Sequence, residues 1–137
     1  MGTLDVINRY YELLAARDRD GLVALFADEF KVTYHAQPNA FPWSGVFEGV
    51  EGFDRFLTVI GEHLEIVEVV QTATIADEAR VVVQCAGHWR VKANGADVKG
   101  GMVNVFTVAD GQISHYEVHA DTHAFSTALA GVPLEGL

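Results

Sequence analysis

The chain has 137 residues, half of them hydrophobic and a fifth charged, which suits one globular domain with a substantial core. A net charge of −10 disfavours nucleic acid and anionic membrane surfaces as partners, because both require clustered lysines and arginines. No apolar run is long enough to span a membrane, no signal peptide is evident, and Cys85 has no disulfide partner, so we expect one cytoplasmic domain over residues 1–137.

The first half of the chain alternates helical and extended patterns. Apolar residues at helical spacing predict a helix over residues 3–17, which Thr3 can cap, and a short second helix follows Gly21. A strand is expected over residues 30–36, a loop over 37–45, a short strand over 46–48 and a third helix over 50–63. The predicted buried stripe of this third helix is Phe53, Phe56, Leu57 and Ile60.

The second half is predicted to consist of four strands. One covers residues 64–75, and three more fill residues 81–121, where apolar and polar residues alternate with a period of two. Asn94-Gly95 predicts a two-residue hairpin loop, which would place Trp89 opposite Gly100. For the next turn we prefer a three-residue loop at residues 109–111, which places Phe106 opposite Ser114 and keeps the apolar side chains on one face.

Alternation also assigns the two faces of this sheet. On the strand over residues 98–108, Asn104 is the one strongly polar side chain in an otherwise apolar row, which makes it a candidate site residue. The inward set comprises Trp89, Val98, Gly100, Met102, Asn104, Phe106, Val108, Tyr116, Val118 and Ala120. The outward set comprises Val82, Ala86, His88, Val103, Val105, Ile113, His115, Glu117, His119 and Asp121. Asp121 is also well placed to cap a C-terminal helix through Leu129.

This order of elements predicts an α+β fold. Three helices from the N-terminal half would pack on the concave face of a curved, mixed or antiparallel sheet. Such a cone-shaped arrangement encloses a pocket, and a pocket of this kind suits a small molecule. Trp43 and Phe56 are expected to join the inward strand residues in its wall.

Several motifs resemble the ketosteroid isomerases. They are Arg9-Tyr10, the run over residues 18–28 (DRDGLVALFAD), Ser44-Gly45, the run over residues 110–113 (DGQI) and Asp121-Thr122. The resemblance covers nearly the whole chain and extends to the nuclear-transport-factor-two-like superfamily, with its SnoaL-like polyketide cyclases. The resemblance implies the cone-shaped fold. It specifies the reaction poorly, because this fold hosts many different reactions.

The resemblance also implies catalytic positions. Tyr10 and Asn104 fall where the isomerases keep the two groups that hydrogen-bond the developing enolate oxygen. The isomerase general base falls at Tyr34, and tyrosine is a poor base near pH 7. His35, one residue further at a possible pocket mouth, is the best candidate for an imidazole base, although a surface histidine is the commoner situation.

Two functions therefore remain open. The first is a cofactor-independent isomerase, cyclase or dehydratase that acts next to a carbonyl of a small apolar, polyketide-like or steroid-like molecule. The second is a non-catalytic ligand-binding or dimerisation module that has lost the catalytic carboxylate. Asp121 could serve as an acid or as a helix cap, and the outward histidines near Glu117 could bind a metal, but we expect no metal and no cofactor.

Residues in three groups carry this hypothesis. The catalytic candidates are Tyr10, Asn104, Tyr34 and His35, and the substrate-binding candidates are Trp89, Met102, Phe106, Tyr116, Val118, Trp43 and Phe56. The apolar part of the outward set predicts burial against a second copy, so we expect a homodimer through the outer sheet face.

Overall fold

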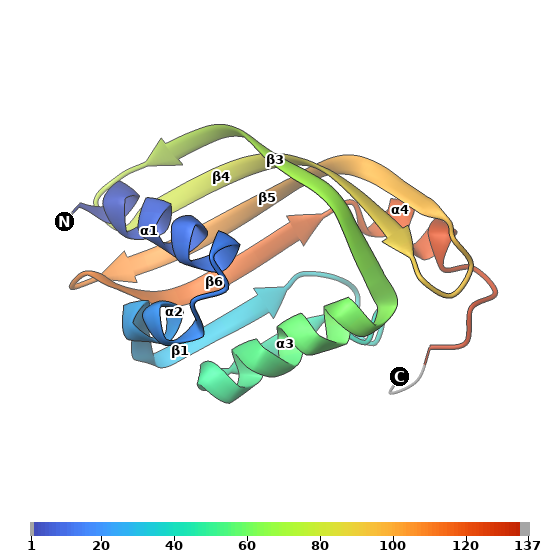
Figure 1. The fold of residues 1–137 in the computed structure, drawn as a ribbon, viewed down its shortest axis with the longest axis horizontal. Helices are drawn as coiled ribbons and strands as arrows, with labels where there is room; N and C mark the ends of the chain where they lie inside the picture. The colour runs from blue at the N-terminus through green and yellow to red at the C-terminus, as the bar shows by residue number, and fades with distance from the viewer. Residues whose placement is uncertain (1, 135–137) are drawn as a thin grey trace.

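A computed structural model describes residues 2–134 of the chain (Figure 1). Its helices are α1 (Thr3–Ala15), α2 (Arg19–Leu25), α3 (Gly49–His63) and α4 (Thr122–Ala128). Its strands are β1 (Phe26–Tyr34), β2 (Gly45–Glu48), β3 (Leu64–Ala76), β4 (Arg80–Val91), β5 (Asp97–Ala109) and β6 (Gln112–Ala120). None of the described helices is long and apolar enough to cross a membrane.

The strands form one curved, unclosed sheet in the order β2-β1-β6-β5-β4-β3. β1 runs parallel to β6, and every other neighbouring pair is antiparallel. Helices α1, α2 and α3 lie on one face of the sheet, and α4 lies at its far end (Figure 1). The α+β fold predicted from the sequence, with a mixed curved sheet and three N-terminal helices on its concave face, is therefore confirmed.

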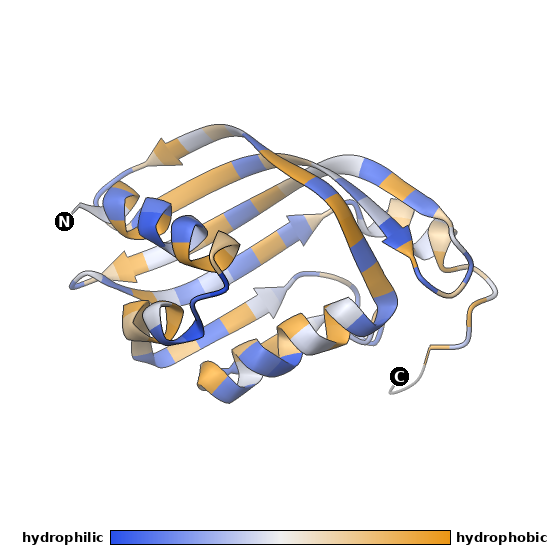
Figure 2. Ribbon diagram, viewed as in Figure 1, coloured by the Kyte–Doolittle hydropathy of each residue, from blue (hydrophilic) through white to orange (hydrophobic). Residues whose placement is uncertain are grey.

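The core lies between these helices and the concave face. Apolar and polar residues alternate along most of the strands (Figure 2), so one side of each strand packs inward. Val6, Ile7 and Leu13 bring the apolar stripe of α1 to the core, and Phe53 and Phe56 do the same for α3. Leu57 was predicted to share the α3 stripe, but it is 40% exposed because it borders a cavity rather than packed core.

Both predicted hairpin registers are wrong. Arg90 pairs with Asp97 and Trp89 with Val98, so the β4–β5 register differs by two residues from the expected one. The turn is longer because the Asn94 side chain accepts from Ala96 N at 2.9 Å and donates to Ala128 O at 2.8 Å. A shift of two residues leaves every side chain on its predicted face.

The β5–β6 turn is the two-residue loop that the sequence argument rejected. Asp110 and Gly111 have φ values of 53° and 75°, as a type I′ turn requires, and Ala109 pairs with Gln112. An irregularity between Thr107 and Val108 shifts the pairing by one residue and so restores the predicted faces beyond it, where Asn104 pairs with Val118. As a result Ile113, predicted to point outward, is fully buried opposite Val108.

The ends of the helices differ in part from expectation. Gly2, not Thr3, is the N-cap of α1, and the Thr3 hydroxyl instead donates to Asp77 O at 2.6 Å on the β3–β4 turn. Asp121 caps α4 by accepting from Ala124 N at 3.0 Å, which confirms the predicted capping role.

Candidate functional site

A cavity of about 480 Å³ lies between α1, α3 and the concave face of the sheet. Nine of the predicted site residues line it, contributed by α1, α3, strands β1, β4, β5 and β6 and the loop before β2: Tyr10, Tyr34, Trp43, Phe56, Trp89, Met102, Asn104, Tyr116 and Val118. Ile66 and Val69 of β3 also border it while being 59% and 39% exposed, so the cavity reaches the surface beside β3. Another hollow at the start of α1, of about 600 Å³, is lined by the β3–β4 and β5–β6 turns and residues beside them, and it has no aromatic side chain in its wall.

Close packing of aromatic rings shapes this cavity. Gly87 makes room for the Trp89 indole, because a Cβ at position 87 would lie 2.1 Å from Trp89 Cη2. Phe106, predicted as a wall residue, lies one layer deeper and does not border the cavity. It stacks on Tyr116 with ring centroids 4.8 Å apart, and this stack supports the wall from below.

A chain of hydrogen bonds crosses the cavity wall at Asn104. The Tyr116 hydroxyl donates to Asn104 Oδ1 at 3.5 Å, and Asn104 Nδ2 donates to the Tyr11 hydroxyl at 3.0 Å. Asn104 is 3% exposed, and it is the only buried polar residue of the core among the described residues. We name these three residues the polar chain of the cavity.

Tyr11 is the site residue that the sequence argument missed. The resemblance points to Tyr10, which lines the cavity but is not part of the polar chain. The two tyrosine rings meet edge to face with centroids 5.1 Å apart, so consecutive residues of α1 both reach the cavity. The available signal was helical spacing, because Tyr11 lies three and four residues before the cavity residues Leu14 and Ala15.

Tyr34 and Trp43 have their polar atoms buried. Neither the Tyr34 hydroxyl nor Trp43 Nε1 has a hydrogen-bond partner among the described residues. Burial raises the pKa of Tyr34 to about 12, and the nearby Trp43 N–H only partly opposes this increase. Tyr34 is therefore protonated at neutral pH and does not supply the base that occupies this position in the isomerases.

The rest of the cavity wall also lacks a base. Burial raises the pKa of Tyr10, Tyr11 and Tyr116 well above that of free tyrosine, and for Tyr11 the hydrogen bond from Asn104 only partly opposes this increase. Burial likewise raises the pKa of the Cys85 thiol. The described residues that line the cavity include no carboxylate, imidazole or amine. Near pH 7 this wall can donate hydrogen bonds, but none of its side chains can act as a general base.

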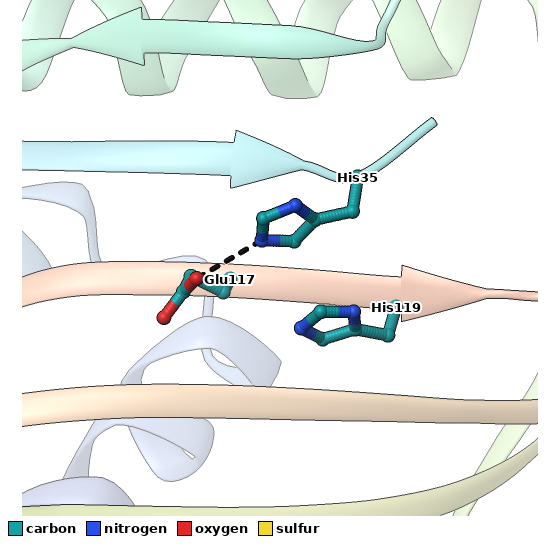
Figure 3. Close-up of side chains that lie close together, drawn as sticks. All are labelled: His35, Glu117 and His119. Atoms are coloured by element: carbon teal, nitrogen blue, oxygen red, sulfur yellow. Dashed lines mark hydrogen bonds and ion pairs between the residues drawn. The ribbon is translucent and has the colours of Figure 1, made fainter. Parts of the chain in front are cut away.

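His35 is not at the mouth of the cavity. It lies on the outer face of the sheet, where its Nε2 is 2.9 Å from Glu117 Oε1 and its ring stacks on that of His119 (Figure 3). The prediction failed because successive residues of an extended chain face opposite sides, and Tyr34 already faces inward. His35, Glu117 and His119, here called the outer-face trio, are the described residues arranged so that they could hold a metal ion.

Solved structures with the same architecture define the class of this fold. An NTF2-like protein from Burkholderia xenovorans LB400 superposes with a TM-score of 0.81 at 21% identity, covering 91% of this chain and 93% of the other. TerC, co-crystallized with polyporic acid, gives 0.79 at 20% identity, covering 93% and 98%. A protein from Jannaschia sp. CCS1, provisionally described as a SnoaL-like polyketide cyclase, gives 0.75 at 24% identity, covering 95% and 92%. These likenesses show a shared NTF2-like fold.

The family follows from the sequence match. The model of the SnoaL-like domain matches residues 7–116, from the middle of α1 into β6. The chain therefore belongs to the SnoaL-like domain family, as its motifs suggested. A comparison with curated proteins found no match.

Proposed function

We propose that the chain binds a small, largely apolar molecule carrying a carbonyl or hydroxyl oxygen, and that Tyr11 donates the hydrogen bond to this oxygen. A volume of about 480 Å³ lies within the range of small-molecule pockets. Aromatic and aliphatic side chains make up most of the wall, so an apolar body is the natural occupant. A few polar groups among them would fix its orientation.

The direction of the hydrogen bonds in the polar chain carries this proposal. Tyr116 donates to Asn104, and Asn104 donates to the Tyr11 oxygen, so neither bond uses the Tyr11 proton. Bonds that run in one direction polarise one another, which strengthens the last donor of the chain. The Tyr11 O–H would therefore be a prepared donor for an acceptor atom of the ligand.

The lack of a base favours binding without chemistry. Proton abstraction next to a carbonyl needs a group that accepts a proton near the working pH. The described cavity wall has none, and its tyrosines hold their protons more tightly than free tyrosine does. We infer that the ligand binds and is released without undergoing a chemical reaction.

Enzymatic isomerisation, cyclisation or dehydration next to a carbonyl is the second candidate. Hydroxyl donors such as Tyr10 and Tyr11 are groups that stabilise an oxyanion as it develops. A protein from Bacillus subtilis with the same fold, at 13% identity and a TM-score of 0.74, is provisionally described as an isomerase. In this mechanism the proton acceptor would be a group of the substrate itself or a water molecule.

One experiment separates the two candidates. Trp43 and Trp89, the two tryptophans of the chain, both line the cavity, so ligand entry should quench their fluorescence saturably. A suitable panel contains unsaturated steroid-like ketones, polyketide-like hydroxy-ketones and polyporic acid, the compound named with TerC. Binding at one ligand per chain, with the compound recovered unchanged by mass spectrometry, supports the binding function. Recovery of an isomer or a dehydrated product establishes the enzyme instead, and no saturable binding rejects both.

We also propose that the protein forms a homodimer through the outer sheet face. Half-buried Val82, Val103 and Val105 lie there, and Val70 and Ile75 of the edge strand β3 are 46% and 65% exposed. Apolar surface of this kind is typical of interfaces. Sedimentation velocity tests the proposal: a dimer that Val105→Lys dissociates supports it, and a monomer at micromolar concentration contradicts it.

A further inference from the structure

We propose that the outer-face trio binds a divalent transition-metal ion of the zinc type (Figure 3). This site lies on the outer sheet face, where His119 and Glu117 pair with Val103 and Val105 of the proposed dimer interface, and it does not depend on the function proposed for the cavity. Two imidazoles and one carboxylate are a ligand set that suits zinc and its neighbours.

The parallel pairing of β1 with β6 brings these side chains together. Thr33 pairs with Glu117 and Tyr34 with Val118, and the His35 N–H continues the ladder by donating to Val118 O at 3.0 Å. His35 therefore lies beside His119 on the neighbouring strand, and Glu117 precedes His119 by two residues on the same face. Two hydrogen-bonded strands thus fix the backbone of all three ligands, which limits the reorganisation that binding requires.

The distances are close to those of a metal site. His35 Nε2 lies 2.9 Å from Glu117 Oε1, and the two imidazole rings are 4.3 Å apart and within 11° of parallel. One ligand atom from each residue lies within 4.8 Å of the others. Metal–ligand bonds of about 2.0–2.2 Å in a tetrahedral site separate ligand atoms by roughly 3.3 Å. Rotation of the exposed His35 and His119 side chains would close this difference without moving the strands.

A neighbouring residue supports the carboxylate. His115 Nδ1 lies 3.7 Å from Glu117 Oε2, the oxygen that does not contact His35, and the other ring nitrogen of His115 is 2.8 Å from Thr33 Oγ1. At 3.7 Å this is a contact rather than a hydrogen bond, and outer-shell neighbours of a ligating carboxylate help to orient it for the metal. His115 is therefore a positioning residue, and three protein ligands would leave at least one coordination position open to water.

A second imidazole–carboxylate pair on the sheet provides an internal control. His88 Nε2 lies 2.7 Å from Asp97 Oδ1, closer than His35 lies to Glu117. However, the third group near Asp97 is the Arg90 guanidinium, at 3.3 Å, rather than an imidazole. This pair lacks a third ligand, and the positive charge of Arg90 opposes a cation there.

The test uses the full chain, without a histidine tag and stripped of metal. Calorimetric titration with zinc chloride should show one ion per chain, and Co²⁺ should give the visible absorption of an imidazole-coordinated ion. His119→Ala, His35→Ala and Glu117→Gln should each weaken zinc binding by at least about 100-fold, and His115→Ala by about 10-fold. His88→Ala should leave the affinity within about twofold, since it removes no ligand.

Three outcomes would overturn the proposal. These are no saturable zinc binding by the unmodified chain, an unchanged affinity in His119→Ala, and a loss in His88→Ala equal to that in His119→Ala. Circular dichroism of each variant shows whether it is folded. A misfolded alanine variant is replaced by His119→Gln, which keeps the side-chain size and removes the imidazole.

Discussion

The two faces of the β1–β6 strand pair are built from alternate residues but have opposite chemistry. Tyr34 and Val118 face a cavity where ionisable side chains are tyrosines and one cysteine, all with raised pKa values. His35 and Glu117, their neighbours in sequence, lie on a surface where imidazoles and a carboxylate contact one another. Parity along two strands therefore separates a face without a proton acceptor near pH 7 from a face that can bind protons and cations.

The largest expected effect is a loss of stability when the packing behind the cavity wall is removed, compared with the same kind of change on the outer face. Phe106 is fully buried and stacked on Tyr116, so Phe106→Ala should lower the free energy of unfolding by about 3–5 kcal/mol. Val105, the preceding residue, is half-buried on the outer face, and Val105→Ala should cost less than about 1.5 kcal/mol. Urea denaturation of both variants measures the difference. Equal losses would mean that the two faces are equally well packed.

Alkaline pH should destabilise the protein through the cavity tyrosines. The folded state keeps the Tyr34 proton up to a pKa of about 12, whereas the unfolded chain releases it near 10. The unfolded state therefore holds fewer protons between these values, and stability falls as pH rises, by up to about 3 kcal/mol from Tyr34.

The control for this prediction is Tyr34→Phe. Urea midpoints measured between about pH 9 and 11 should fall less steeply in this variant than in the unmodified protein. Parallel slopes would show that Tyr34 titrates in the folded state as it does in the unfolded chain.

Adding one methyl group at Gly87, beside the Trp89 ring, or at Gly101 compares the two faces at single positions. A Cβ at position 87 would lie 2.1 Å from the Trp89 indole, whereas one at position 101 would meet only Cys85 O, at 3.9 Å. Gly87→Ala should lower stability by about 1–3 kcal/mol and shift the emission of Trp89, because the ring must leave its place. Gly101→Ala should leave the emission unchanged. A normal spectrum in Gly87→Ala would contradict the position assigned to the indole.

The smallest effect is expected on the outer face. Thr33→Val removes the 2.8 Å hydrogen bond to His115 while keeping the shape of the side chain. Because both groups are partly exposed and water can replace the bond, the loss should be about 1 kcal/mol or less. Thermal denaturation measures this value, and the Val105→Ala variant provides a second outer-face substitution for comparison. A loss of several kcal/mol would show that contacts on the outer face contribute as much to stability as those around the cavity, which would contradict this prediction.

Alternation in the sequence was enough to predict the faces but not the registers. Asn104 is inward and His119 outward as predicted, because two-residue shifts in the β4–β5 and β5–β6 pairings leave parity intact. Ile113 was misplaced because the irregularity between Thr107 and Val108 adds a residue that no local pattern marks.

The catalytic candidates could be predicted only in part, for two physical reasons. His35 was placed near the cavity by closeness in sequence, although parity already turned it outward. Tyr11 was missed because the resemblance names one tyrosine, while the geometry of α1 brings two consecutive tyrosines to the cavity. Which of the two contacts Asn104 depends on the register between α1 and β5, and this register is a tertiary property.

The central claim is that Tyr11, rather than Tyr10, donates to the ligand oxygen. The most direct test compares Tyr11→Phe with Tyr10→Phe by tryptophan fluorescence titration of a ketone that the unmodified protein binds. Tyr11→Phe should weaken binding by about 3–10-fold, the loss of one hydrogen bond, and Tyr10→Phe should change it by less than about twofold. A larger loss in Tyr10→Phe than in Tyr11→Phe would contradict this account and restore the residue that the sequence resemblance indicates.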